Sequence, residues 1–327
     1  MIYVETASRN PYFNFAVEEY FMTEKPQSDT VFLFWQTEPT VMLGKFQNSY
    51  KELNLANIEA DQVNVVRRQT GGGTIYTDRG GWQFSFILPE KSEQINFGQF
   101  MDPIIAALAD LGIQAEYNSR NDLVIEGRKI SGNAQCSRGN FTLHHGSLLY
   151  ATDFSKMASY LNVPEHKLKS KGINSVRSRT ANIQSFCPEQ WRSEEFAERM
   201  IAAILANGAE KMQLTTADIE ACEKIANEKF RSWEWTYGKN PAFTMIRSRV
   251  FTGGLLEISL EVKAGKISAC SFQGDFFSAK GVEELVEELI GTPYQKAALE
   301  NVILQNKYEN LIHKIMPLEI LSCFFDD

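Results

Sequence analysis

Cysteine and histidine are scarce in this chain of 327 residues, which contains five of the first and four of the second. The cysteines are odd in number, scattered and without a CxxC pair, so the sequence predicts neither a disulfide framework nor a zinc site. No apolar run approaches the roughly eighteen residues of a membrane span, and no basic stretch precedes an apolar one at the N-terminus. We therefore expect a cytoplasmic protein with neither a signal peptide nor a membrane-spanning helix.

Positive charge is also in short supply, because 33 basic residues stand against 41 acidic ones. This balance argues against nucleic acid held by bulk electrostatics and makes a local basic cluster informative. The segment "EHKLKSKGINSVRSRT", residues 165–180, is such a cluster, with one acid, Glu165, beside Lys167, Lys169, Lys171, Arg177 and Arg179. It could clamp a phosphorylated intermediate or receive an acidic partner, and a solvated loop is the alternative.

Short apolar runs and two kinds of periodicity indicate the fold class. Asn10 and Pro11 announce a first helix as N-cap and first-turn residue, and helical spacing recurs in 97–112 and 193–208. Strand-like runs are found at 31–35, 39–44, 63–68, 82–88 and 141–150. Because strands and helices do not alternate regularly, we expect an α+β (mixed α/β) fold with a mixed sheet and packed helices.

The pattern restarts near residue 246. Two strand-like runs, 255–262 and 266–274, precede a helical segment, 278–291, whose apolar side is expected to contain Val282, Leu285, Val286, Leu289 and Ile290. The sequence thus predicts two domains, residues 1–245 and a small α+β domain of residues 246–327.

The stretch "NDLVIEGRKISGNAQ", residues 121–135, predicts a β-hairpin that carries charge where apolar residues would pack better. Its two-residue turn is Glu126-Gly127, with glycine at the positive backbone angle. The predicted register pairs Ile125 with Arg128, Val124 with Lys129, Leu123 with Ile130 and Asp122 with Ser131. Asp122 and Lys129 would then be diagonal neighbours on one face, roughly 7 Å apart at the backbone and able to share a ligand.

The glycine-rich stretch "RRQTGGGTIYTD", residues 67–78, predicts a backbone that can approach an anionic ligand closely. Arg67 or Arg68 could supply a planar fork for phosphate or carboxylate. The stretch lacks the GxxxxGK[ST] pattern of the P-loop. A glycine-rich turn with solvated arginines is the alternative.

Three further candidates, two histidines and one cysteine, are favoured as packing residues. His144 and His145 are adjacent on an alternating strand, so one must face each side of the sheet, and neither has metal-ligand spacing to other residues. Cys136 follows the hairpin and could be a nucleophile, but a lone cysteine is more often a small buried hydrophobe.

Taken in order, the segments "PTVMLGKFQN", "RRQTGGGTIYTD", "RNDLVIEGRKISGNAQ", "HHGSLL", "KGINSVRSRTANI" and "SWEWTYGKNPAF" closely resemble those of the bacterial lipoate-protein ligases. The part after "NPAF" is similar to the accessory domain of the longer members. The resemblance implies a biotin/lipoate ligase-like catalytic domain in which lipoate and ATP, with magnesium, give lipoyl-adenylate. The lipoyl group then passes to a lysine on lipoyl domains of 2-oxoacid dehydrogenase E2 subunits or on the glycine-cleavage H protein.

The same resemblance implies the site residues. It assigns Lys129 to catalysis, at the carbonyl of lipoate and the α-phosphate, and Asp122 with Asn121 to magnesium or the nucleotide. The implied set for ATP and lipoyl-adenylate is Arg68, Gly71, Gly72, Gly73, Thr74, Ile75, Tyr76, Asn121, Asp122, Lys129, Ser131, Gly132, Ala134, His145, Gly146 and Arg179. The basic segment matches the loop that closes over the adenylate, so residues 168–182 are expected to be poorly ordered or displaced without ligand.

Three positions depart from the family pattern. A related activity on the same fold is the nearest alternative interpretation. Many members have His at Thr77, Ser at Asn133 and Asn at Gly81, and these changes concern fine nucleotide contacts rather than the class of reaction. The rival is an octanoyl- or lipoyl-transferase of the same fold, which uses a cysteine thioester and no ATP, with Cys136 as the candidate nearest the motifs. A biotin-protein ligase and a catalytically silent acyl- or nucleotide-binding protein are more distant alternatives.

Overall fold

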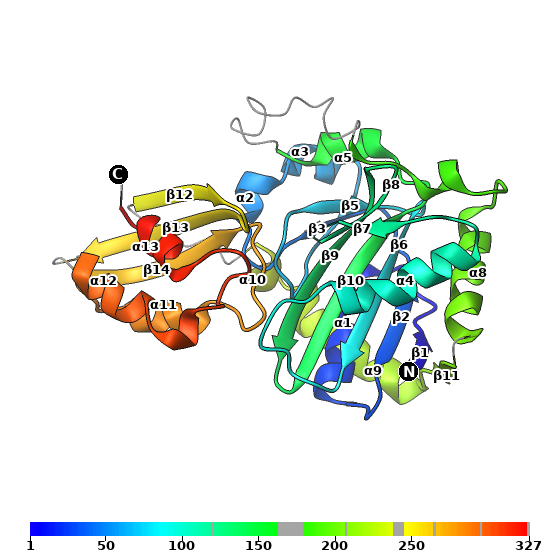
Figure 1. Cartoon of the computed structure of the whole chain (residues 1–327), viewed down its shortest axis with the longest axis horizontal. Coiled ribbons are helices and arrows are strands. Elements are labelled where there is room, and N and C mark those ends of the chain that lie inside the picture. Colours follow the sequence, from blue (N-terminus) through cyan, green and yellow to red (C-terminus); the bar gives the residue numbers. More distant parts are fainter. Residues whose placement is uncertain are drawn as a thin grey trace.

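The computed structural model describes residues 1–118, 121–162, 179–206, 208–237, 245–263, 266–294 and 296–325. An eight-stranded sheet dominates it, in the order β11-β1-β2-β6-β10-β9-β8-β7 (Figure 1). The strands are β1 (Ile2–Glu5), β2 (Val31–Trp35), β6 (Gly81–Leu88), β7 (Glu116–Tyr117), β8 (Asp122–Ile125), β9 (Arg128–Arg138), β10 (Phe141–Leu149) and β11 (Glu210–Gln213). Pairs β1–β2 and β1–β11 are parallel and the others antiparallel, so the predicted mixed sheet is confirmed.

Helices cover both faces of this sheet. One face packs against α4 (Gly98–Asp110) and α8 (Ser193–Ala206), and the other against α1 (Pro11–Thr23), α9 (Thr216–Ile225) and the π-helical turn η2 (Ala226–Phe230). Strand β2 shows why its sequence is a continuous apolar run: Phe32 and Phe34 enter the first core, while Leu33 and Trp35 enter the second. The α+β class expected from the sequence is confirmed.

Helix α1 begins as predicted. The Asn10 carboxamide accepts hydrogen bonds from the amides of Tyr12 (3.0 Å) and Phe13 (3.3 Å), and Pro11 occupies the first turn. Every residue of α1 from Phe13 to Met22 is buried, rather than one face alone. The helix is enclosed by the large sheet, α9 and η2, so two glutamates in its middle are forced into the interior.

A second, three-stranded sheet lies beside the first. Its order is β4-β3-β5, with β3 (Thr40–Leu43), β4 (Asn64–Arg67) and β5 (Ile75–Thr77). Short helices flank it: α2 (Ser49–Glu52), α3 (Leu55–Ala60), α5 (Phe154–Tyr160) and α10 (Trp233–Thr236). The 3₁₀ turn η1 (Ile183–Phe186) instead contributes Ile183 to the first core of the large sheet. Val41, Leu43 and Tyr76 form a small core here with Tyr160, whose ring centroid is 5.4 Å from that of Tyr76.

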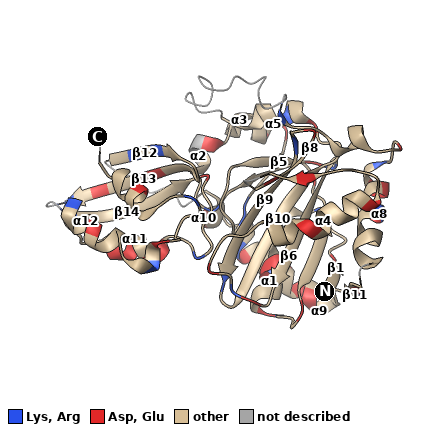
Figure 2. Cartoon of the chain, viewed as in Figure 1, with Lys and Arg blue, Asp and Glu red and all other residues tan. Residues whose placement is uncertain are grey.

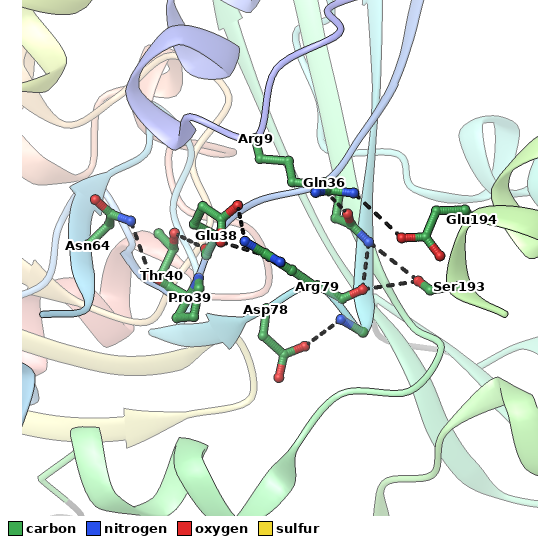
Figure 3. Close-up of polar contacts among 11 residues, drawn as sticks. Arg9, Gln36, Glu38, Pro39, Thr40, Asn64, Asp78, Arg79, Ser193 and Glu194 are labelled. Atoms are coloured by element: carbon green, nitrogen blue, oxygen red, sulfur yellow. Dashed lines mark hydrogen bonds and ion pairs between the residues drawn. The ribbon is translucent and has the colours of Figure 1, made fainter. Parts of the chain in front are cut away.

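A polar junction fixes the turn between β5 and β6 (Figure 3). The Arg79 guanidinium pairs with both carboxylate oxygens of Glu38, at 2.9 Å each. The Arg79 carbonyl accepts from Gln36 Nε2 (2.6 Å) and Ser193 Oγ (3.0 Å), and Asp78 accepts from the Gly80 amide (2.9 Å). The junction therefore ties the start of β6 to the β2–β3 connection and to α8.

The C-terminal unit, residues 245–325, has its own sheet and core. Strands β12 (Met245–Phe251), β13 (Gly254–Lys263) and β14 (Lys266–Gly274) pack on α11 (Glu283–Leu289), α12 (Lys296–Ile303), the 3₁₀ turn η3 (Asn306–Tyr308) and α13 (Pro317–Ser322). Helix α11 is rich in acidic residues (Figure 2), of which Glu283, Glu284 and Glu287 are exposed. The sequence missed β12, and Ile290 is 44% exposed because α11 ends at Leu289. The division at residues 245 and 246 stays a prediction.

The two units lie side by side (Figure 1), and they meet at the glycine-rich segment. The Gly72 amide donates to the Phe276 carbonyl (2.9 Å), and the Phe276 ring stacks on Phe46 with centroids 4.6 Å apart. Lys45 Nζ lies 2.8 Å from Glu283 Oε1. The C-terminal unit therefore rests on residues 44–46 and 71–73. Within the described ranges, no helix has the length and apolar character that crossing a membrane requires.

Candidate active site

A cavity of about 320 Å³ lies where the two sheets and the C-terminal unit meet. Its lining residues are Phe15, Trp35, Met42, Arg68, Gly72, Gly73, Thr74, Ile75, Gln83, Phe97, Asn121, Lys129, Gly132, Asn133, Ala134, His145, Gly146, Ser147, Thr252, Gly253, Gly254, Asp275, Phe277, His313 and Lys314. Eleven residues of the predicted site line it: Arg68, Gly72, Gly73, Thr74, Ile75, Asn121, Lys129, Gly132, Ala134, His145 and Gly146.

The hairpin β8–β9 forms around the predicted turn. Both central residues take positive angles, Glu126 with φ 51° and Gly127 with φ 71°, as in a type I′ turn. Next to the turn the register is as predicted, with Val124 opposite Lys129. Beyond it the prediction was wrong, because the register shifts between Leu123 and Val124 and leaves Ile130 as an extra residue on β9.

This bulge decides which side chains reach the cavity. Asp122 lies opposite Gly132 rather than Ser131, and Ser131 is fully buried, where its Oγ accepts from Asn133 Nδ2 (3.2 Å). Asp122 Oδ1 is 2.6 Å from Lys129 Nζ, as the diagonal arrangement required. A Cβ atom at position 132 would lie 2.9 Å from Lys129 Nζ, so glycine leaves the room that the amine occupies.

Asn121 and Asn133 fasten the start of β8 to β9. Asn121 Nδ2 donates to the Asn133 carbonyl (2.8 Å), and both the amide and Nδ2 of Asn133 donate to the Asn121 carbonyl (3.0 Å each). Asn133 is one of the three departures from the family pattern. Here its longer side chain makes a clasp that holds Asp122, the next residue after Asn121, in place.

Both arginines before the glycines are buried, so the solvated-arginine alternative is wrong. Arg68 donates to the carbonyls of Gly71 (2.8 Å), Gly73 (2.7 Å) and Met42 (3.0 Å), and Arg67 donates to other backbone carbonyls. Burial lowers the pKa of Arg68 to about 9 and that of Arg67 to about 10, so both stay charged at neutral pH. In this structure Arg68 holds the shape of the glycine segment.

A chain of buried polar groups connects the cavity to that segment. Glu18, fully buried on α1, accepts from Ser85 Oγ (2.6 Å) and lies 3.1 Å from His145 Nδ1. His145 Nε2 is 2.7 Å from Thr70 Oγ1, which accepts from Arg68 Nε (3.2 Å). Because a carboxylate only accepts, the N–H at Nδ1 of His145 donates to Glu18. Sequence analysis missed Glu18, whose only signal is a glutamate amid the apolar residues of α1.

The adjacent histidine lies in the opposite core, as strand alternation predicted. His144 stacks on Phe100 with ring centroids 4.5 Å apart, and its Nε2 is 3.3 Å from Asn133 Oδ1. Burial, with a smaller effect from His145, lowers the pKa of His144 well below its usual value, so the ring is neutral. Cys136 is also buried away from the cavity, and burial raises the pKa of its thiol to about 12.

The remaining predicted residues lie outside the lining. A Cβ on Gly71 would lie 2.2 Å from the Phe276 carbonyl oxygen, so this glycine serves contact between the units. Tyr76 is buried in the small core, Asp122 reaches the cavity only through Lys129, and Arg179 is exposed. Ser131 was predicted to be a site residue, but it does not line the cavity, because the bulge turns its side chain into the protein interior.

The predicted closing loop, 168–182, lies outside the described residues from 168 to 178. Its end is attached to the site: the Ala181 amide donates to the Lys129 carbonyl (2.9 Å). The Asn182 side chain exchanges two hydrogen bonds with the backbone of Thr152, both 3.0 Å.

The other two departures from the family pattern are neighbours in space. Thr77 Oγ1 accepts from Nε2 of Gln83, which lines the cavity (2.9 Å). A Cβ atom at Gly81 would lie 3.0 Å from both Thr77 Oγ1 and Thr152 Oγ1. Gly81, which is smaller than the asparagine of many family members, therefore leaves room for the hydroxyl group of Thr77.

The described residues contain no group of three or more His, Cys, Asp or Glu side chains that could hold a metal ion. Asp122 is the carboxylate nearest Lys129, to which it is paired. A magnesium ion here would need most of its ligands from phosphate oxygens and water, which is how magnesium is commonly bound with nucleotides.

Comparison with known proteins gives consistent results over nearly the whole chain. Residues 10–205 match the family described as "Lipoyl protein ligase A/B catalytic domain", and residues 240–324 match "Bacterial lipoate protein ligase C-terminus". Lipoate-protein ligase LplJ of Bacillus subtilis is 36% identical over 93% of each chain. Lipoate–protein ligase 1 of Staphylococcus aureus is 38% identical over 90% of each.

One solved structure has the same fold over almost its full length. The crystal structure of P. falciparum LipL1 in complex with lipoate aligns with a TM-score of 0.78 and 22% identity, covering 93% of this chain and 94% of that one. The matches to both family descriptions and the identities to the bacterial enzymes cover the catalytic and the C-terminal unit alike. The chain therefore belongs to the lipoate-protein ligase family.

Proposed function

We propose that this ligase activates lipoate with ATP in the cavity and then transfers the lipoyl group to a lysine of a lipoyl domain. The observation that carries the assignment of the site is the position of Lys129. Its amine is held 2.6 Å from Asp122, over a glycine, in a cavity whose other wall is apolar. A positive point charge at such a place suits a reaction that builds negative charge on a carboxylate and a phosphate.

The chemistry requires activation because a carboxylate is a poor electrophile at neutral pH. In the first step a carboxylate oxygen of lipoate attacks the α-phosphorus of ATP, and the bond from that phosphorus to pyrophosphate breaks. In the second step the acceptor amine attacks the carbonyl carbon of lipoyl-adenylate, AMP leaves, and the amine loses a proton as the amide forms. Lys129 would neutralise charge at the carbonyl and the α-phosphate in the first step.

The cavity offers lipoate one orientation. We call Phe15, Trp35, Met42 and His145 the closed end, and Asn121, Asp122, Lys129 and Gly132 the charged end. Ala134, opposite His145, lies five residues from Lys129 on β9, roughly 15 Å of strand. A carboxylate beside Lys129 would therefore direct an eight-carbon chain along the strand toward the apolar closed end.

The glycine segment and Asn121 would bind the nucleotide. Gly73, Thr74 and Ile75 line the cavity beside Arg68, and glycine lets phosphate oxygens approach the backbone. Asp122 would contribute an oxygen to magnesium, the remaining ligands being phosphates and water, and the ion would neutralise phosphate charge. Binding of this kind competes with the ion pair between Asp122 and Lys129, which frees the amine for the substrate.

The proposed acceptors are lipoyl domains of 2-oxoacid dehydrogenase E2 subunits and the glycine-cleavage H protein. Membership of the family supports this class of partner. We further propose that the enzyme works in the cytoplasm, which agrees with five cysteines that are all free and mostly buried.

The cysteine-dependent transferase is disfavoured by the state of Cys136. A thioester mechanism needs a thiolate in the pocket, whereas this thiol is buried outside the cavity and neutral at physiological pH. Cys136→Ser should retain full activity. Loss of transfer in this variant, with its fold intact, would instead favour the rival.

Pyrophosphate release by the purified protein tests the proposal directly. With ATP, magnesium and lipoate, we expect a burst of pyrophosphate without acceptor and continuous turnover once an apo lipoyl domain is added. Omission of lipoate is the matched control. Lipoyl transfer from octanoyl- or lipoyl-protein without ATP, and no pyrophosphate in its presence, would refute the proposal.

A further inference from the structure

Four residues of the cavity lining form a row across the large sheet. The pairing of β9, β10, β6 and β2 places them opposite one another, in the order Gly132, Ser147, Gln83 and Trp35. Neighbouring strands are about 4.8 Å apart, so Gln83 lies roughly 10 Å from Gly132, where the Lys129 amine is held. The row therefore leads from the charged end of the cavity to Trp35 of the closed end.

Gln83 brings a carboxamide to the floor between the two ends. The residue is 4% exposed, and its Nε2 donates to Thr77 Oγ1 (2.9 Å). Among the described residues, no protein group donates a hydrogen bond to its Oε1. Gln83 lines the cavity and this oxygen is not sealed off from it, so the oxygen is an acceptor available to a bound ligand.

Two of the departures from the family pattern fix this carboxamide. Thr77 stands where many members have His, and its hydroxyl group receives the Gln83 amide. Gly81 stands where many have Asn, and it leaves room for that hydroxyl group. Both Thr77 and Gly81 are buried. Through Gln83, the two departures therefore bear on the part of the cavity that receives the tail of the acid.

The tail of the substrate should meet the Gln83 oxygen. Gln83 is opposite Trp35 and diagonal to His145 in the sheet, the two side chains between which the far end of the acid would lie. A plain alkyl tail would strip Oε1 of solvent and offer no donor in return, which weakens binding. The sulfur atoms of lipoate are polarisable, and in reduced lipoate they carry S–H donors.

We propose that Gln83 is a specificity-determining residue that selects a sulfur-bearing tail over the plain alkyl chain of octanoate, an inference that rests on the function proposed above. Thr77 is the positioning residue for its carboxamide, and Gly81 provides the space that Thr77 needs. The choice of acid is thus made on the cavity floor, away from the carboxylate that reacts.

The first test compares three acids on the same protein sample. Pyrophosphate release gives kcat/KM for reduced lipoate, lipoate and octanoate, and the ratio between two acids cancels any loss of folded protein. In Gln83→Leu the ratio of reduced lipoate to octanoate should fall by about tenfold, because leucine removes the oxygen that an alkyl tail leaves unpaired. The ratio of lipoate to octanoate should fall in the same direction. Unchanged ratios for both forms of lipoate would overturn the inference.

Gln36→Leu is the matched control for loss of a buried glutamine. Gln36 lies outside the cavity lining and is paired at both ends: its Oε1 accepts from Arg9 Nε (2.9 Å), and its Nε2 donates to the Arg79 carbonyl (2.6 Å). This variant should lower Tm and leave both ratios unchanged. A fall in the ratios as large as that in Gln83→Leu would show that selectivity follows stability, and it would overturn the role of Gln83.

A third variant tests the positioning of the carboxamide. Thr77→Val keeps the shape of the side chain but removes the acceptor of the Gln83 amide, so the carboxamide can turn. The ratio of reduced lipoate to octanoate should fall by a smaller factor than in Gln83→Leu. Added to Gln83→Leu, Thr77→Val should change the ratio no further, whereas additive effects would overturn the assignment of Thr77.

Failure of this inference and failure of the proposed function give different results. If wild-type protein releases pyrophosphate with lipoate but Gln83→Leu keeps the wild-type ratios, the role of Gln83 is overturned alone. If wild-type protein releases no pyrophosphate with any of the three acids, the proposed function fails.

Discussion

At the closed end of the cavity the polar groups are buried and paired with one another, whereas at the charged end they are partly exposed and joined in one ion pair. Glu18, His145 and Thr70 form hydrogen bonds of 2.7–3.1 Å, and Glu18 is 0% exposed. The Lys129 side chain is 38% exposed and that of Asp122 17%. The first arrangement fixes shape, and the second can exchange its partner for a substrate.

This difference assigns separate tasks to the two ends. A buried, satisfied network has no spare donor for a ligand and gives rigidity instead. An accessible ion pair is weak, so a phosphate or carboxylate can replace one partner at modest cost. Changes at the charged end should therefore affect catalysis with little change in stability, and changes at the closed end should do the reverse.

The largest effect is expected at Lys129. Lys129→Ala should lower the rate of lipoyl-adenylate formation by at least about a hundredfold, as loss of a preorganised donor does, and leave the unfolding free energy nearly unchanged. Single-turnover pyrophosphate release measures the rate. Arg128→Ala, which removes the neighbouring exposed charge on β9, serves as control and should stay near wild type. Near-normal adenylation by Lys129→Ala would remove the lysine from its role.

The next effect is on stability at the closed end. Glu18→Ala leaves the Ser85 hydroxyl and the His145 N–H buried without an acceptor, so the free energy of unfolding should fall by about 3 kcal/mol. Glu18→Gln keeps one acceptor and should lose less. Urea unfolding monitored by tryptophan fluorescence measures both. Equal stability of Glu18→Ala and the wild type would mean that the network is not what stabilises this end.

A similar test concerns the anchor of α1, the helix that carries Glu18. Asp218 on α9 accepts from Lys25 Nζ (2.8 Å) and Tyr20 Oη (2.6 Å). Burial alone raises the pKa of Asp218, but hydrogen bonds from Lys25, Tyr20 and Thr215 outweigh it and hold the pKa well below its ordinary value. The native pKa is the lower one, so the stabilisation is complete above about pH 4 and is lost as pH falls further.

Asp218→Asn should therefore lower the free energy of unfolding by about 2 kcal/mol at pH 7 and by clearly less at pH 3. Denaturant titrations of both proteins at the two pH values provide the measurement. A difference that does not shrink in acid would show that the carboxylate charge contributes nothing to this anchor.

The smallest of these effects is expected at Gly132, at the charged end of the cavity. Gly132→Ala places a methyl group 2.9 Å from Lys129 Nζ, and the flexible lysine should move aside with little cost in stability. Adenylation should slow by about tenfold, because small misplacements of a catalytic group are costly. Gly98→Ala is the matched control, since its Cβ would meet nothing closer than 3.7 Å. Unchanged adenylation in Gly132→Ala would show that the amine does not need its observed position.

Features of the site that depend only on residues close in sequence were predicted best. The hairpin turn was predictable because Glu126-Gly127 separates two alternating runs, and the proximity of Asp122 to Lys129 followed from it. The bulge at Ile130 was not, because nothing in the local sequence distinguishes an extra apolar residue from a paired one. Ser131 was consequently placed on the wrong side.

Long-range contacts account for the other differences. Glu18 was missed because a helical glutamate ordinarily faces solvent, and only the packing of α1 against the sheet buries it. The part of the cavity lining that comes from the C-terminal unit, such as Gly253 and Phe277, was missed because a wall shared between two units leaves no pattern in either one. Strand β12 was missed because this edge strand, with alternate exposed residues, carries too little apolar signal.

A structure of the protein with lipoate and a non-hydrolysable ATP analogue tests the central claim most directly. We predict the Lys129 amine within hydrogen-bonding distance of the lipoate carboxylate and the α-phosphate, with the ring of lipoate between Trp35 and His145. An amine that stays on Asp122 and turns away from both ligands, or a lipoate chain that runs in the opposite direction, would contradict the account.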